Sequence, residues 1–154
     1  MRRIGLTAAG LLVTLTLALS LATSGRAKAP LAHTCSATDR QFIETAKTNI
    51  TAIGLWGQEY LTGDAGAGEV VAEAKRAAQI VEGTQPSDPS LQQARTLMRS
   101  MFVEYGRAIR AHARHGDAGS HMFRAYGIAN STHEVLANAA PALAARGCDV
   151  APLL

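Results

Sequence analysis

The chain has 154 residues, with 15 Lys and Arg, 12 Asp and Glu, and two cysteines. After removal of the leader predicted below, about 125 residues remain, enough for one hydrophobic core but not for two domains. Four basic residues lie in that leader, so eleven basic residues balance twelve acidic ones in the remainder. A formal charge near −1 excludes the strongly basic surface that nucleic-acid binding requires.

The N-terminal segment has the three-part order of a secretory signal peptide. Two arginines follow Met1, the residues from Ile4 to Ala22 are uncharged and mostly apolar, and small residues come next. This order predicts a signal peptide over residues 1–29, with several small residues offering alternative cleavage points. The apolar run is also close to the length that spans a bilayer, so an uncleaved N-terminal anchor is the alternative.

Residues 30–154 are expected to form a single helical domain. Arginine outnumbers lysine, and alanine and glycine are abundant, which is typical of GC-rich bacterial genomes. We therefore expect a bacterial protein that is secreted or held in the cell envelope.

The first half of this domain predicts two amphipathic helices, because apolar residues recur every three or four positions. The first helix follows Ser36, a capping residue with Asp39 three positions later, and ends near Leu61. The second runs over residues 68–82, and Gly83 is a typical residue for ending a helix.

The second half predicts two longer helices. One covers residues 89–115, begins with a proline in its first turn and ends at Gly116. The other begins at Asp117 or Ser120 and continues to the second cysteine, with Pro141 expected to kink it. No segment alternates as a strand does, so the fold class predicted is all-α.

Two cysteines, Cys35 and Cys148, flank the first and the last helix. In an antiparallel bundle with short turns, an even number of helices returns the chain to its starting end. A disulfide requires α-carbons within about 7 Å, which that arrangement provides. We therefore predict an up-down-up-down four-helix bundle closed by one disulfide; free thiols and pairing between chains are the alternatives.

Three of the five histidines lie within ten residues, at the turn between the third and fourth helices. His112 and His115 are expected to share a helix face, and His121 begins the next helix. Imidazoles in such a cluster suit Zn, Cu or Ni, with Asp117 or Asp64 as a fourth ligand or an orienting partner. The competing interpretation is a half-polar bundle end, where histidines face solvent beside a helix C-terminus.

A haem site is a further interpretation of the same helices. Their inner faces carry residues that can serve as axial ligands, namely Met98, Met101, Met122, Tyr105, Tyr126, His112 and His121. The Cys-x-x-Cys-His attachment motif is missing from the sequence, and methionines on an inner helix face usually fill a core.

The sequence has none of the common hydrolase, phosphate-loop, dinucleotide or zinc-protease motifs. Glu104 is the one acidic residue inside the third helix and has no evident partner.

The first functional hypothesis is therefore a non-catalytic exported bundle that interacts with an envelope or extracellular protein, and touches a membrane only if the leader is uncleaved. The alternative is an extracytoplasmic metal- or haem-binding protein. An exposed apolar groove would favour the first hypothesis, and converging imidazoles the second.

Overall fold

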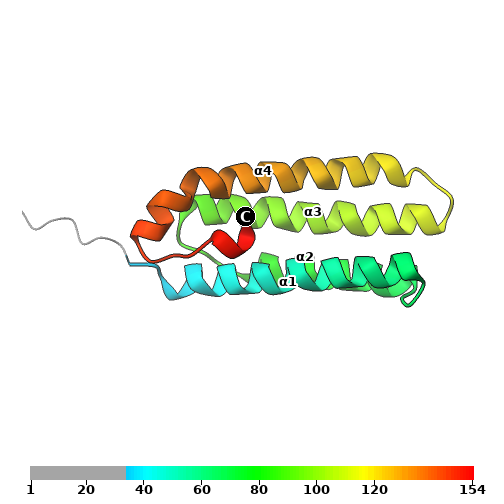
Figure 1. The fold of residues 1–154 in the computed structure, drawn as a ribbon, viewed down its shortest axis with the longest axis horizontal. Helices are drawn as coiled ribbons and strands as arrows, with labels where there is room; N and C mark the ends of the chain where they lie inside the picture. Colours follow the sequence, from blue (N-terminus) through cyan, green and yellow to red (C-terminus); the bar gives the residue numbers. More distant parts are fainter. Residues whose placement is uncertain (1–33) are drawn as a thin grey trace, which may run out of the picture. The chain divides into compact units, whose positions relative to one another are not determined.

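The computed structural model describes residues 34–154, and these residues are helical with no strand among them. The four helices are α1 (Ala37–Thr62), α2 (Ala67–Gly83), α3 (Pro89–Ala113) and α4 (Ala118–Ala145), as Figure 1 shows. A short 3-10 helix, η1 (Ala151–Leu153), follows α4 and has no counterpart in the prediction. The all-α prediction is confirmed, whereas the signal peptide predicted over residues 1–29 lies outside the described residues.

Side-chain caps set the helix starts close to their predicted positions. The hydroxyl oxygen of Ser36 accepts a hydrogen bond from the backbone N–H of Asp39 at 3.0 Å, as an N-cap residue should. Asp88 caps α3, and its carboxylate accepts from the next two free N–H groups, those of Ser90 and Leu91. These caps satisfy backbone donors that have no partner inside their helices.

Two helix ends depart from a regular α-helix. α3 ends at Ala113, two residues earlier than predicted, because the backbone enters the left-handed region at His115, with φ of 55°. α4 continues through Pro141, which cannot donate a backbone hydrogen bond. Figure 1 shows the last part of α4 turning away from the direction of its first part, as the predicted kink requires.

One end of the bundle is held by a covalent bond. Cys35 and Cys148 form a disulfide with their α-carbons 5.1 Å apart, which confirms the predicted pairing. Beside it, the N–H of Cys35 donates to the carbonyl of Arg146 at 2.7 Å. The start of α1 and the end of α4 therefore lie together.

Two buried carboxylates extend this link to the other helices. Asp39 in α1 accepts from the N–H and the hydroxyl of Ser87 at 2.7 and 2.8 Å, and from the N–H of Asp88 at 3.0 Å. Asp88 in turn accepts from the guanidinium of Arg146 at 2.5 Å. We call Asp39, Asp88, Arg146 and the disulfide the closing network. It joins the start of α1, the loop between α2 and α3, and the end of α4.

The charge of Asp39 is stabilised inside this network. Its side chain is only 5% exposed. Burial raises the pKa of Asp39, but hydrogen bonds from Asp88, Ser36 and Ser87 outweigh burial and hold the pKa below its usual value. The carboxylate is therefore ionised in the folded protein at neutral pH.

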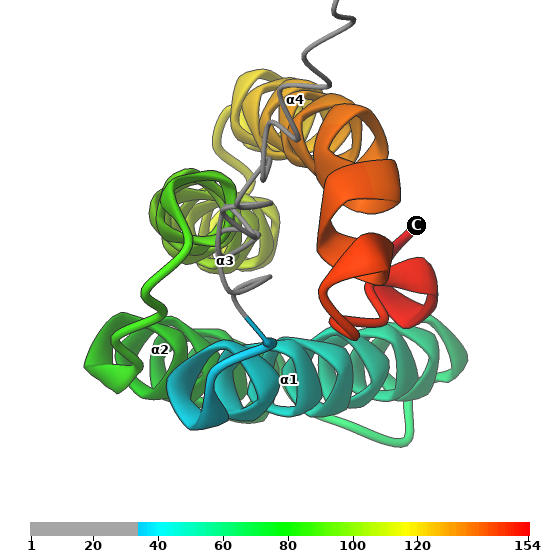
Figure 2. The same cartoon turned by 90° about the vertical axis from the view of Figure 1, so that its left-hand side faces the viewer.

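The hydrophobic core draws on all four helices at one end of the bundle and on only three at the other. Near the closing network, side chains of all four helices pack together, including Phe42, Ala77, Met98 and Leu136. Toward the opposite end, a second cluster draws on α1, α2, α3 and the turn between α1 and α2, but not on α4. Within the described residues, no α-carbons of α1 and α4 come within 8 Å of each other, and η1 lies between the two helices (Figure 2). The first half of α4 therefore rests on α3 alone.

Reduction of the disulfide should lower the free energy of unfolding by about 4–5 kcal/mol in the chain-entropy model, because the bond joins positions 113 residues apart. Urea unfolding of residues 30–154 with and without reductant measures this difference. A Cys35→Ser, Cys148→Ser double variant should match the reduced protein and be insensitive to the reductant. Equal midpoints for the oxidised and reduced wild type would contradict this role.

The Asp39→Asn variant should lose about 2 kcal/mol of stability at pH 7, because an amide donates where the carboxylate accepts. The folded pKa of Asp39 lies below its usual value of 3.8, so its stabilisation is complete above about pH 5 and is lost as pH falls through the folded pKa. Urea midpoints of wild type and variant should therefore converge below pH 4. Glu44→Gln, an exposed acid on the same helix, is the control. A deficit in Asp39→Asn that stayed constant down to pH 2 would argue against a carboxylate effect.

Candidate functional site

The structure does not assemble the predicted histidine cluster on one helix face. The ring of His112 packs edge-on against the ring of Tyr60, with centroids 6.0 Å apart. His115 lies in the turn after α3, where its left-handed backbone turns it out of the helical series. His115 therefore lies outside the helix that carries His112, and the metal-binding role of His112, His115 and His121 stays a prediction.

The other predicted ligands have partners of their own. His121 lies with Nδ1 2.8 Å from a carboxylate oxygen of Glu104. Asp117 caps α4 by accepting from the N–H and hydroxyl of Ser120, and Asp64 accepts from the hydroxyl of Thr62. Among residues 34–154, no three His, Cys, Asp or Glu side chains are placed together to hold a metal ion. The predicted Zn, Cu or Ni site is thus not assembled from these residues.

Glu104, for which the sequence suggested no partner, is the centre of an ionic network. Its carboxylate lies 2.8 Å from His121, 2.5 Å from Arg107 and 3.1 Å from Arg124. The hydrogen bond with His121 lowers the pKa of Glu104 most; burial opposes it, and Arg124 and Arg107 lower the pKa further, to about 2. The network ties α3 to the first half of α4, the part that the four-helix core does not hold.

An apolar groove lies in the space between α1 and α4. It has three adjoining sections, with volumes of about 490, 570 and 410 Å³. The first two sections share Tyr105, Gly119 and Met122, and the second and third share Met101 and Ala129. We call these three sections together the α1–α4 groove. Residues of α3 form its floor, and α1 and α4 form its walls.

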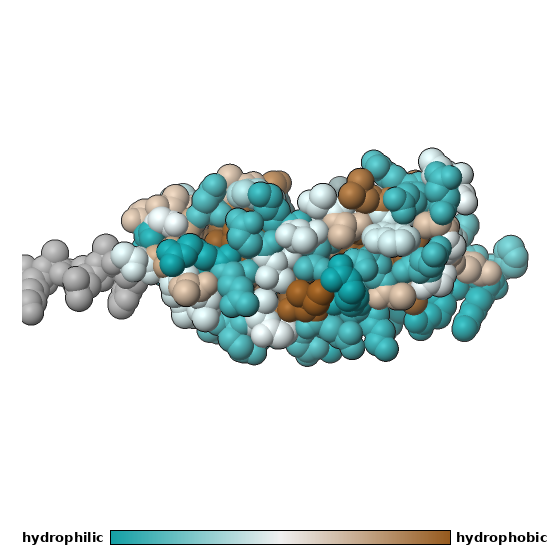
Figure 3. All heavy atoms as spheres, turned by 90° about the horizontal axis from the view of Figure 1, so that it is seen from below, coloured by the Kyte–Doolittle hydropathy of each residue, from teal (hydrophilic) through white to brown (hydrophobic). Residues whose placement is uncertain are grey.

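Large hydrophobic side chains are concentrated along this groove. Eight such side chains are exposed in the described residues, and six of them line it, namely Ile50, Leu61, Met122, Phe123, Tyr126 and Leu154. None of the lining residues is Asp, Glu, Lys or Arg. By contrast, the face seen in Figure 3 is mostly hydrophilic, with hydrophobic atoms in small separate patches. The groove is therefore the most apolar surface that these residues present.

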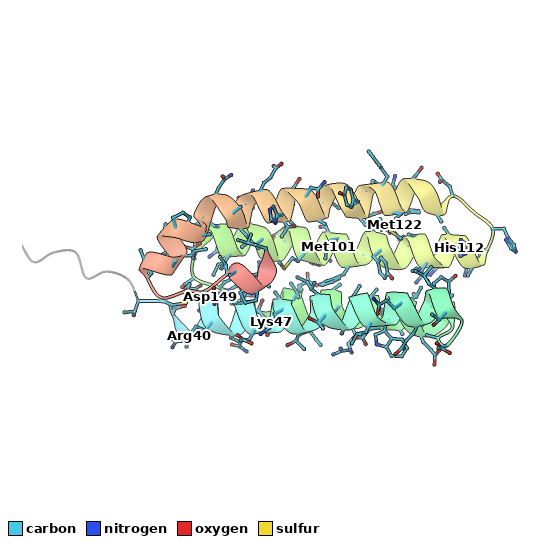
Figure 4. The ribbon with its side chains drawn as sticks, viewed as in Figure 1. Arg40, Lys47, Met101, His112, Met122 and Asp149 are labelled. Atoms are coloured by element: carbon cyan, nitrogen blue, oxygen red, sulfur yellow. A yellow bond between two sulfur atoms is a disulfide. The ribbon has the colours of Figure 1, made fainter. Side chains whose placement is uncertain are left out.

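Methionines and glycines give the groove an adaptable shape. Three of the four methionines, Met98, Met101 and Met122, line it, and Figure 4 labels two of them on this side of the bundle. Methionine is flexible and polarisable, so it adjusts to apolar partners of different shapes. On the α1 wall, a side chain at Gly54 would meet no atom within 4 Å, so the wall is open there.

Tyr105 on the floor lies close to the α1 wall. A Cβ atom at Gly57 would lie 2.7 Å from the Tyr105 hydroxyl, so a larger residue there would displace the tyrosine ring. Burial raises the pKa of Tyr105, and the neighbouring Tyr60 raises it further. The phenol therefore stays neutral near neutral pH, which keeps the groove uncharged at this point.

Sequence reasoning missed the groove because it assigned one inner face to the fourth helix. The buried series contains Ala125, Thr132 and Leu136, which pack on the core. A second apolar series, Met122, Tyr126 and Ala129, has the same three-to-four spacing and lines the groove. Two such series on one helix are the signal that would have indicated a second contact surface.

Comparisons with protein-family models, with known proteins and with solved structures find no match. In residues 34–154, no helix combines the length and apolar character that crossing a bilayer requires. The functional argument therefore rests on the groove itself.

The Glu104→Gln variant should lose about 1 kcal/mol of stability at pH 7, since Arg107 and Arg124 are more than half exposed and such pairs are weak. The folded pKa of about 2 lies below the usual 4.5, so the contribution is complete above about pH 5 and disappears as pH falls through about 2. Hydrogen exchange should rise in the first half of α4. Glu134→Gln, an exposed acid on the same helix, is the matched control; equal exchange in both variants would contradict the role of Glu104.

Proposed function

We propose that the protein is an exported, non-catalytic helical-bundle protein that binds a partner in the α1–α4 groove. The observation that carries this proposal is the gathering of six exposed large hydrophobic side chains in a groove that no Asp, Glu, Lys or Arg lines. Monomeric proteins rarely leave a continuous apolar surface of this kind in water unless it binds something. The groove is also the feature that favours an interaction protein over a metal-binding one.

Export is supported by two independent features. The leader has the order of a secretory signal peptide, and the disulfide is a bond that persists in oxidising compartments. The proposal includes one domain that begins near residue 30, with its helices in up-down-up-down order. The closing network supports that order, because it joins the start of α1 to the end of α4.

A non-catalytic role is supported by the chemistry of the groove. No Asp, Glu, Lys or Arg side chain lines it, and its two histidines, His112 and His133, belong to different sections of the groove, the first and the third. General acid–base catalysis uses positioned groups that exchange protons near neutral pH, usually more than one of them. Binding by shape and burial of apolar surface is the chemistry that this lining supports.

The neutral fluorescent dye N-phenyl-1-naphthylamine should bind the exported domain saturably at one site. Met122→Glu should weaken this binding by about tenfold or more, because the new carboxylate must lose water when the groove fills. Met122 is 42% exposed, so the fold should tolerate the change. A fluorescence titration gives both affinities.

Leu55→Glu is the matched control, because Leu55 is 56% exposed but does not line the groove. It should bind the dye as the wild type does. Absence of dye binding to the wild type, or equal loss in the two variants, would contradict the proposal.

A further inference from the structure

We infer that the α1–α4 groove receives one amphipathic α-helix of a partner protein, about three turns long and uncharged on its contacting face. This inference rests on the proposed function and specifies the occupant. The helix would take the place between α1 and α4 that no element of residues 34–154 fills at that end of the bundle.

The chain itself shows what kind of segment fits. η1 lies close to both α1 and α4, whose α-carbons stay more than 8 Å apart. Its Leu153 packs against the core, and Leu153 and Leu154 line the groove section nearest the closing network. Figure 2 shows η1 in the space between the two helices. A short helical segment with apolar side chains thus already occupies one end of the groove.

The length of the groove that η1 leaves open sets the length of the partner helix. On the floor helix, the open part extends from Met101 to His112. Eleven residues of an α-helix rise about 16 Å, so a partner helix of about three turns would match it. Along this length, Met101, Tyr105 and Ile109 recur every four residues. A helix with apolar residues at positions i, i+3, i+4 and i+7 would place its side chains between them.

The backbone of the groove favours a helix over an extended peptide. Walls and floor come from α-helices, whose N–H and C=O groups bond within each helix except near the ends. An extended peptide would find few backbone partners here and would bury unpaired polar groups. A helix satisfies its own backbone groups, so it can enter an apolar groove without that cost.

The open side of the groove favours an amphipathic occupant over a small apolar molecule. The exposed side chains Leu61 and Phe123 stand on opposite walls, and both are more than three-quarters exposed. Sites for small molecules usually enclose most of the ligand surface. A helix with one apolar and one polar face would bury the first and leave the second in water. Because no Asp, Glu, Lys or Arg lines these two sections to pair with a buried charge, the buried face of the helix should be uncharged as well.

The test uses an 18-residue peptide of leucine, lysine and glutamine with its leucines on one helical face. A shuffled peptide of the same composition, without an apolar face, is the peptide control. The amphipathic peptide should bind the exported domain one to one, gain helical circular dichroism on binding and displace N-phenyl-1-naphthylamine. The shuffled peptide should do none of these.

The variant for this test is Gly54→Leu. Gly54 lines the groove, a Cβ atom at this position meets no other atom within 4 Å, and leucine favours a helix interior more than glycine does. This variant should therefore unfold at a temperature no lower than the wild type, yet bind the amphipathic peptide at least about tenfold more weakly. Leu55→Glu, outside the groove, should keep wild-type affinity.

Each of the alternative results would reject a different part of the proposal. Dye binding without peptide binding would reject the helix and leave the groove as a site for a small apolar molecule. Loss of both would reject the proposed function as well. A wild type that sediments as a dimer while Gly54→Leu sediments as a monomer would make the occupant a second copy. Binding to phosphatidylcholine vesicles that Gly54→Leu abolishes would assign the groove to lipid.

Discussion

The charge of Asp39 is the constraint on which the arrangement of the helices depends. This buried carboxylate accepts three hydrogen bonds from Ser87 and Asp88, which fixes the first turn of α1 against the loop that begins α3. Asp88 caps α3 and binds Arg146 at the end of α4. One pair of acids therefore sets the positions of the helix ends that the disulfide then locks covalently.

The groove exists because the closing network holds the four helices together at one end of the bundle only. Where the closing network acts, all four helices contribute to one core; beyond it, α1, α2 and α3 keep packing together while α4 leaves the shared core. Glu104 holds the first half of α4 on α3 through His121 and Arg124, while Arg107, on α3 itself, pairs with the same carboxylate. The α4 wall of the groove is thus held by α3 and not by α1. An apolar surface that would be buried in a closed four-helix bundle is left facing solvent.

The sequence was sufficient to predict the features that follow from residue spacing and from the residues at helix ends. The helix period, the cap at Ser36 and the cysteines flanking the outer helices predicted four helices and one disulfide, and the structure confirms them. The groove and the roles of Asp39 and Glu104 depend on contacts between distant segments, which residue spacing does not encode. Residue spacing also does not reveal the left-handed backbone at His115, which places this residue in the turn after α3 and outside the helix that carries His112.

The central claim is that the α1–α4 groove is open to solvent in the free protein. The methyl groups of Met98, Met101 and Met122 report on it directly, because all three line the groove at different depths. Selective carbon-13 labelling, with a neutral soluble nitroxide added, would measure their accessibility by NMR. The account predicts strong broadening at Met122, which is 42% exposed, weaker broadening at Met101, and a sharp signal from Met98, which is 1% exposed. Equal protection of all three methyl groups would show that α1 and α4 close over the groove, and would contradict the account.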